Sequence, residues 1–251
     1  MKHKTLIFIG FFMALLLATA LESRAADIPF PSIKIGVDQA KTPQDVAMSI
    51  QILLVLTILS LAPAILIMMT AFTRIVIVLA FLRQGLGSQQ VPPNQVLIGL
   101  SLFLTFFIMQ PTFERVDKEA LGPYLAGKLT TAEAFKKAED PMRQFMFKQT
   151  REKDLALFVA LSKSSRPRTT ADISTWVLIP AFVIGELKKS FEMGFIIFIP
   201  FLIIDMVVAS VLMSMGMLML PPVLISLPFK ILLFIMVDGW NLIVRSIALS
   251  F

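Results

Sequence analysis

The sequence predicts an all-α membrane protein with two long, kinked helical hairpins and a small helical soluble domain inserted between them. Three observations lead to this fold class. The 251 residues are 57% hydrophobic with a mean hydropathy of +0.82. Only 16% of them are charged, against about 25% in soluble domains. Long apolar runs flank one charged stretch, and prolines or turn residues interrupt these runs.

The first 25 residues have the three parts of a secretory signal peptide. Two lysines and a histidine precede a 15-residue apolar run, and Ser23 and Ala25 stand at −3 and −1 of a cleavage site. We expect 1–25 to be removed, so that the polar segment 26–45 begins the mature chain outside the cytoplasmic membrane. This start places the later charged domain outside and both hairpin turns towards the cytoplasm. An uncleaved first membrane helix is the alternative, although the run is short for a span.

Residues 46–111 are predicted to form the first helical hairpin. The apolar sequence from Val46 to Leu82 would make roughly 55 Å of helix, against about 30 Å of hydrocarbon. This helix therefore either kinks at Pro63 or stands partly clear of the lipid. A polar turn over Gly85–Pro93 then reverses the chain into a second helix at about 95–109.

Residues 112–175 form the predicted soluble helical domain. Residues 112–172 carry 12 Lys or Arg and 9 Asp or Glu, too many for a lipid-facing segment. Thr130 and Glu133 have the spacing of a capping box, and Asp140 before Pro141 predicts the start of a further helix. The apolar stripe of that helix consists of Met142, Phe145, Met146, Leu155, Phe158 and Val159. We expect this stripe to pack on itself or on a neighbouring copy, because so small a domain buries little alone.

Residues 176–251 are predicted to form the second helical hairpin, kinked at Pro200. Glu186 to Glu192 interrupt its first helix and are typical of a solvated helical turn. Four methionines then alternate along the chain: Met213, Met215, Met217 and Met219. Because a helix turns about 100° per residue, alternate positions cannot form one stripe. The methionines therefore predict a helix end running into a loop, with ordinary lipid-facing or core methionines as the alternative. Gly216 and the pair Pro221 and Pro222 also favour a loop.

Several ionisable residues lie within or at the edge of the apolar runs: Arg74, Asp205, Lys230, Asp238 and Arg245. Each charge at a helix centre costs about 2.5–3.5 kcal/mol. We therefore expect these groups to meet partners on other helices or other chains, or to face water. Lys230 is predicted to pair with an acidic residue of its own or a neighbouring subunit, and Asp205 is one candidate. For Arg74, Arg83 and Arg245 the alternative is snorkelling at the membrane interface.

The composition argues against several kinds of chemistry. The chain has no cysteine, and its single histidine lies in the predicted signal peptide. It has no nucleophile elbow, Walker loop or histidine-based metal site, so we expect neither an enzyme nor a cofactor. Asp205 and Asp238 could suit an intramembrane aspartic protease, but the Gly-x-Gly-Asp motif is absent. The net charge of +6 is not gathered in a basic patch interleaved with aromatics, so no nucleic acid partner is predicted.

Three stretches, 72–111, 145–158 and 180–243, carry a resemblance to a known family. They begin FTRIVIVLAF, FMFKQTREKD and PAFVIGELKK, and they cover more than half of the mature chain in the expected order. In these stretches the chain resembles the FliP family, a membrane component of the flagellar type III export gate with relatives in virulence secretion. The flagellar branch fits better than the virulence branch.

The resemblance implies a non-enzymatic subunit of a helical, ring-like oligomer. Five copies of such a chain would join two smaller membrane proteins, FliQ and FliR, at the centre of the flagellar basal body. The chain would cross the bacterial inner membrane several times, with much of it on the periplasmic side. It would pass unfolded flagellar proteins, while other components of the export apparatus supply the energy.

The methionine-rich loops of the family form a gasket around the export channel. Carried over to this chain, Met217 and Met219 after Gly216 would be the gasket, and the two preceding methionines would lead into it. Family members often have another methionine where Leu218 stands here, which leaves the methionine count of the ring open. Two other interpretations remain: an ion channel or transporter without a protein substrate, and a purely structural membrane scaffold.

Overall fold

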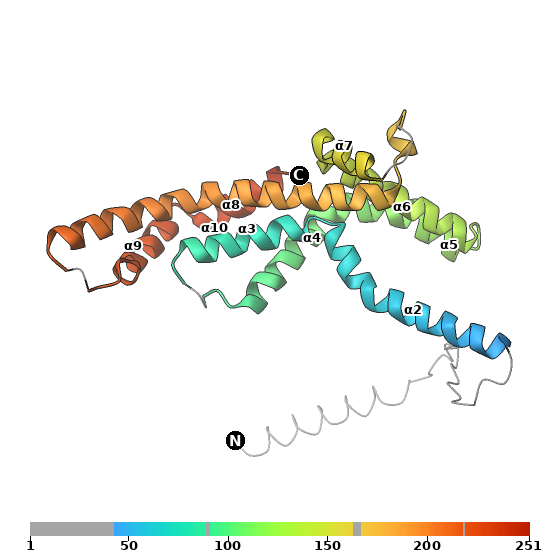
Figure 1. The fold of residues 1–251 in the computed structure, drawn as a ribbon, viewed down its shortest axis with the longest axis horizontal. Coiled ribbons are helices and arrows are strands. Elements are labelled where there is room, and N and C mark those ends of the chain that lie inside the picture. Colours follow the sequence, from blue (N-terminus) through green and yellow to red (C-terminus); the bar gives the residue numbers. More distant parts are fainter. Residues whose placement is uncertain (1–42, 89–90, 163–166, 218) are drawn as a thin grey trace, which may run out of the picture. The chain divides into compact units, whose positions relative to one another are not determined.

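The computed structural model describes residues 43–88, 91–162, 167–217 and 219–251. The predicted signal peptide and most of the polar segment after it lie outside these ranges. The described residues form helices and connecting turns, without a strand among them (Figure 1). The chain divides into two compact units, Met1–Leu53 and Leu54–Phe251, and the second unit holds the packed helices.

Two helices replace the predicted continuous run from Val46 to Leu82. They are α2, Pro43–Met68, and α3, Phe72–Gly85. The helix continues through Pro63, and the break falls at 69–71 instead. Thr70 explains this position, because its hydroxyl donates to the Ile67 carbonyl and accepts from the Phe72 N–H. Such local side-chain bonds compete with helical hydrogen bonds.

The returning helix of the first hairpin is longer than predicted. α4 spans Asn94–Val116, and the π-helical turn η1, Asp117–Leu121, and the short α5, Gly122–Leu125, follow it. The expected end near residue 109 is wrong, because the helix continues through Pro111. The apolar hairpin therefore runs into the charged region without a break at residue 112.

The charged region folds into two further helices, α6, Thr131–Gln149, and α7, Glu152–Leu161. The predicted capping box at Thr130 is confirmed. The predicted helix start at Asp140 is wrong, because α6 continues through Pro141. The chain breaks instead at Thr150 and Arg151, which have extended backbone conformations. The predicted apolar stripe is thus divided between the two helices.

Part of the apolar stripe of the charged region packs together, since Phe145, Met146 and Leu155 lie in one cluster, and this cluster also packs on α8. Met146 is fully buried with Leu178 and Phe182 of α8, a helix that spans Thr175–Ser214. Phe145 stacks edge-on against Phe182 with ring centroids 5.9 Å apart. The expectation that the stripe packs on itself is therefore met in part, while the long apolar helix α8 supplies the remaining surface that a short charged domain lacks.

The capping box of α6 gives a prediction for pH. The Thr130 backbone N–H and hydroxyl both donate to the Glu133 carboxylate, and they hold the pKa of Glu133 below its usual value of 4.5. Since the pKa is lower in the folded chain, the ionised carboxylate stabilises the first turn at neutral pH. This stabilisation is lost as the pH falls from the unfolded pKa through the folded one.

Hydrogen exchange can check this prediction. Protection of the Glu133 amide, corrected for the intrinsic exchange rate, should fall between pH 6 and pH 3. In the Glu133→Gln variant, which has no carboxyl at this position, the same protection should stay level. Equal pH profiles in the two proteins would contradict the prediction.

Three further elements complete the chain: the 3-10 turn η2, Thr170–Asp172, and the helices α9, Pro222–Met236, and α10, Gly239–Leu249. The last part of the predicted second hairpin bends by 66° between α9 and α10. Asp238 stands at the bend in the left-handed conformation, with φ 49° and ψ 54°. Short polar side chains such as aspartate adopt this conformation more readily than most residues.

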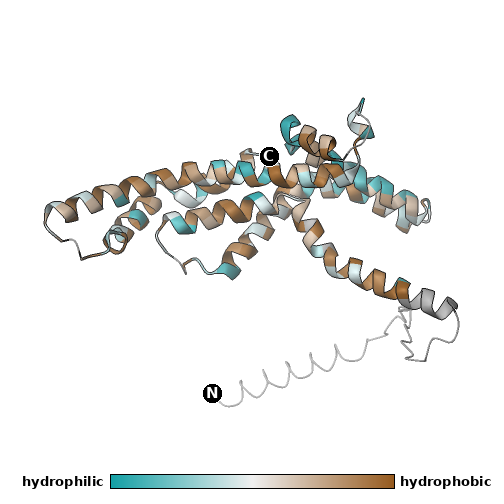
Figure 2. Ribbon diagram, viewed as in Figure 1, coloured by the Kyte–Doolittle hydropathy of each residue, from teal (hydrophilic) through white to brown (hydrophobic). Residues whose placement is uncertain are grey.

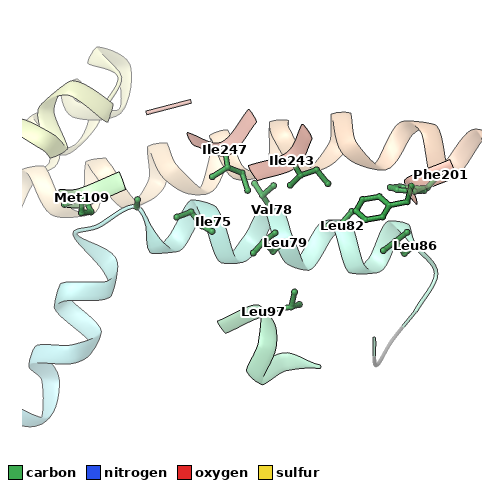
Figure 3. Packing of buried hydrophobic residues seen from close by; sticks show 12 residues of the cluster. Ile75, Val78, Leu79, Leu82, Leu86, Leu97, Met109, Phe201, Ile243 and Ile247 are labelled. Atoms are coloured by element: carbon green, nitrogen blue, oxygen red, sulfur yellow. The ribbon is translucent and has the colours of Figure 1, made fainter. Parts of the chain in front are cut away.

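The main hydrophobic core surrounds α3. Its buried side chains from this helix are Ile75, Val78, Leu79 and Leu82. Figure 3 shows Leu97 of α4 on one side of this row, Ile243 and Ile247 of α10 beside it, and Phe201 of α8 near its end. Among the described helices, α3 and α8 share the most extensive contact.

Two described helical segments are long and apolar enough to cross a membrane, namely Asn94–Leu125 and Thr175–Ser214. The bent pair α9 and α10 forms a third if it is counted as one span. Figure 2 shows apolar residues along α8 and α9 and a concentration of hydrophilic residues on α5 to α7. The prediction of an all-α membrane protein is confirmed for the described residues.

Candidate functional site

A methionine-rich turn joins α8 to α9. We call Met213–Met217 together with Met219 and Leu220 the methionine turn. Gly216 has φ +75°, which a residue without Cβ adopts at little cost. Its N–H donates to the Met213 carbonyl and that of Met217 to the Leu212 carbonyl, both at 3.0 Å. These two bonds form a Schellman motif, so the turn has a defined backbone at the end of α8.

The methionine side chains of this turn point away from the core of the chain. Met219 is 98% exposed, and the other three are between 38% and 68% exposed. The alternative of ordinary core methionines is therefore contradicted within this chain. Pro221 caps α9 and Pro222 begins it, as expected for prolines at a helix start. The turn thus exposes flexible, unbranched thioether side chains on the surface of the chain.

The second polar feature lies between α8 and α9. Lys230 Nζ donates to Asp205 Oδ2 at 2.6 Å, and the Ser226 hydroxyl donates to Asp205 Oδ1. We call these three residues the polar node. Ser226 is fully buried and Lys230 is 2% exposed. Asp205 is thus the partner of Lys230 within one subunit. Ser226 was not predicted from the sequence, and only its spacing of four residues from Lys230 could have indicated it.

The third feature is a fully buried ion pair between α3 and α8. Arg74 Nε donates to Glu186 Oε2 at 2.7 Å, and its Nη2 makes a second bond to Glu186 Oε1. Both side chains are 0% exposed, so snorkelling is excluded for this arginine. The prediction that Glu186 lies on a solvated turn is wrong. Its spacing of four residues from Phe182, a buried neighbour on one helix face, is the signal that could have placed it inside.

Further groups complete the coordination of Arg74. Nη2 also donates to Gln149 Oε1 at 3.0 Å, and Nη1 donates to the carbonyl and the hydroxyl of Ser250. The Phe251 ring lies 3.7 Å from the guanidinium carbon, a cation–π distance. Every side of the guanidinium is therefore in contact with protein groups from α6, α8 and the residues after α10. Sequence reasoning did not identify Gln149 or Ser250.

The remaining charged candidates are not brought into these clusters. Asp238 and Arg245 are exposed, and in the described ranges no hydrogen bond or ion pair joins their side chains to another residue. Arg83 donates to the Asn94 side chain across the α3–α4 turn. Among the described residues, no three His, Cys, Asp or Glu side chains are grouped as a metal ion would require.

The fold and these sites define a class: an all-helical membrane protein whose apolar helices enclose buried ion pairs and expose a methionine turn. Within this class the chain belongs to the FliP family, whose model matches residues 55–247.

Several relatives share most of the chain. The flagellar biosynthetic protein FliP of Bacillus subtilis (strain 168) is 60% identical over 217 residues, which cover 86% of this chain and 98% of that protein. The protein of the same name from Caulobacter vibrioides is 55% identical over 80% of this chain and 76% of its own length. That of Treponema denticola is 48% identical over 91% and 84%.

Proposed function

We propose that this chain is a non-enzymatic subunit of the flagellar type III protein export gate. In this proposal it forms, with further copies of itself and with FliQ- and FliR-like proteins, the channel that passes unfolded flagellar proteins across the bacterial inner membrane. Membership of the FliP family and the name of its relatives support a flagellar role. The observation that supports the role as a gate is the methionine turn, which is apolar, exposed and fixed by its backbone hydrogen bonds.

The length of α8 supports assembly with other chains. Its 40 residues correspond to about 60 Å of helix, roughly twice the thickness of the hydrocarbon core. The ends of a helix this long extend beyond the hydrocarbon core, yet large apolar side chains near both ends, such as Trp176 and Met213, are more than half exposed. Exposed apolar surface outside the lipid must be covered by protein. Five copies with the two smaller partners, as the family resemblance implies, would provide that cover.

The chemistry of methionine suits a closable gasket. Its side chain is unbranched, has three rotatable bonds and fills irregular gaps. A ring of such side chains from several copies could close on itself and exclude water, as hydrophobic constrictions do in channels. The same ring could deform around an extended polypeptide of varying shape. Met217 and Met219, the two methionines that follow Gly216, would form this seal.

The double variant Met217→Ala/Met219→Ala tests the proposed function. Each substitution removes the flexible thioether and leaves a small methyl group, so the closed channel should leak small ions. We expect faster dissipation of an ion gradient in cells or vesicles that contain the assembled gate, with a normal amount of assembled complex. The matched control is Met206→Ala, because Met206 is 65% exposed on α8 but lies outside the methionine turn.

The same experiment separates the two other interpretations. A purely structural scaffold would show no leak in either variant and normal export of flagellar proteins. A transporter without a protein substrate would remain stable without FliQ- and FliR-like partners, and its loss would not affect the export of flagellar proteins. A leak confined to the turn variant, together with dependence on those partners, is the result that we expect.

A further inference from the structure

The contact between α8 and α9 is apolar except at the polar node. In the part of the chain that the structure describes, every hydrogen bond that joins the two helices ends on the Asp205 carboxylate. Ser226 Oγ lies 2.5 Å from Oδ1 and Lys230 Nζ lies 2.6 Å from Oδ2. Ser226 and Lys230 are four residues apart on α9 and therefore project from the same face. Each carboxylate oxygen thus has its own donor from one helix face.

The polar node is largely removed from water. Ser226 is 0% exposed, and the side chains of Lys230 and Asp205 are 2% and 23% exposed. The α3–α4 turn covers the lysine, since a Cβ placed on Gly87 would lie 3.5 Å from Lys230 Nζ. A desolvated ion pair is stable only when its remaining lone pairs also find donors. The Ser226 hydroxyl supplies the donor that water would otherwise give to Oδ1.

Between the polar node and the methionine turn, packing alone does not fix α9 on α8. The two helices line a groove of about 490 Å³. Its lining is wholly apolar: Ile203, Ile204, Val207, Val208, Val211, Leu212, Ile225 and Phe229. Apolar contacts are non-directional, and small polar groups are what hold helices in register where the surroundings are apolar. The node therefore determines the angle and register of the hairpin that carries the turn.

We propose that Ser226 is a positioning residue for the methionine turn. By holding Asp205 in the orientation that meets Lys230, it fixes α9 on α8, and thereby the place of the turn about 14 Å further along α8. The consequence for closure of the channel rests on the proposed function. The position of α9 relative to α8 can be measured without any transport assay.

Spin labels can measure the position of α9 directly, because the chain contains no cysteine. Labels are placed at Met206→Cys on α8 and Leu224→Cys on α9, two sites that are 65% and 68% exposed. Labelled chains are diluted into unlabelled natural copies of the assembled complex, so that the natural chains carry assembly. The distance distribution between the two labels is then compared in Ser226→Ala, Ser226→Thr and the control Ser210→Ala. The Ser210 hydroxyl bonds only within its own helix, to the Met206 carbonyl.

We expect Ser226→Ala to broaden or shift the distance distribution, with displaced conformers rising roughly tenfold, as for a lost hydrogen bond to a charged group. Ser226→Thr keeps a hydroxyl and should restore the natural distribution, and Ser210→Ala should leave it unchanged. The inference is overturned if the distributions of Ser226→Ala and Ser210→Ala coincide. It is also overturned if Ser226→Thr behaves like Ser226→Ala, because the hydroxyl would then not be the cause.

The ion leak of the same variants distinguishes this inference from the proposed function. A shifted distribution with a raised leak supports both the positioning and the gate. A shifted distribution without any leak supports the positioning by Ser226 and contradicts the role of the methionine turn as a seal. An unchanged distribution contradicts the positioning whatever the leak.

Discussion

Removing the carboxylate of Glu186 is expected to destabilise the folded chain by about 3–5 kcal/mol, as breaking a buried ion pair does in other proteins. In Glu186→Leu the guanidinium of Arg74 stays fully buried and keeps its charge, because arginine does not lose its proton in proteins. The side chain would lose both hydrogen bonds to Glu186. The cost is therefore mainly that of an uncompensated buried charge.

The loss of Glu186 should affect more than the α3–α8 contact, because Arg74 also binds residues of other elements. The same guanidinium binds Gln149 at the end of α6 and Ser250 after α10, while Lys189 of α8 donates to both the carbonyl and the side chain of Gln149. A displaced Arg74 would disturb the ends of all these elements together. We therefore expect the charged region and the last helix to loosen along with the α3–α8 contact.

The double variant Arg74→Met/Glu186→Leu gives the sharpest form of this prediction. Replacing both partners with apolar residues removes the buried charge, so the double variant should be more stable than either single one. The control is Glu192→Leu, because its ion pair with Lys188 is more than half exposed and such pairs contribute about 0–1 kcal/mol. Thermal unfolding of the detergent-solubilised protein measures all four variants. A double variant that is the least stable of them would contradict the argument.

Local patterns in the sequence predicted several parts of this structure correctly. Long apolar runs and the charged stretch between them gave the all-helical membrane class. The Thr130 capping box depends only on residues within one turn, and the end of α8 near Gly216 depends on the spacing of methionines, glycine and prolines. These features are readable because their causes lie within a few residues of each other.

Several of the failures involve contacts between distant residues. Glu186 is polar and stands in a charged cluster, and only Arg74, 112 positions away, explains its burial. Asp140 and Pro141 have the local signature of a helix start, but Pro141 is buried inside α6, where packing overrides the signature. Pairing of Lys230 with Asp205 was one of several possibilities, since charge alone did not select a partner.

A side chain at position 194 is expected to weaken the contact between α3 and α8. Gly194 of α8 faces Phe81 of α3 in the most extensive helix contact of the chain. A Cβ at this position would lie 2.6 Å from Phe81 Cγ and 3.0 Å from Phe81 Cβ. The ring cannot simply swing aside, because it also packs edge-on against Phe191 with centroids 5.3 Å apart. The absence of a side chain at residue 194 is therefore what lets the two helices approach.

Gly194→Ala should therefore destabilise the chain by about 1–3 kcal/mol through overpacking, although alanine by itself favours a helix over glycine by up to about 1 kcal/mol. Gly99→Ala is the matched control, because nothing lies within 4 Å of a Cβ there and the substitution should be neutral or stabilising. Gly194→Ala should cost less in a Phe81→Ala background than in the natural chain, since Phe81→Ala removes the ring carbon Cγ that the new methyl would meet at 2.6 Å. Thermal unfolding in detergent compares these variants, and equal effects of the two alanine substitutions would mean that helix propensity, not the α3–α8 approach, decides the outcome.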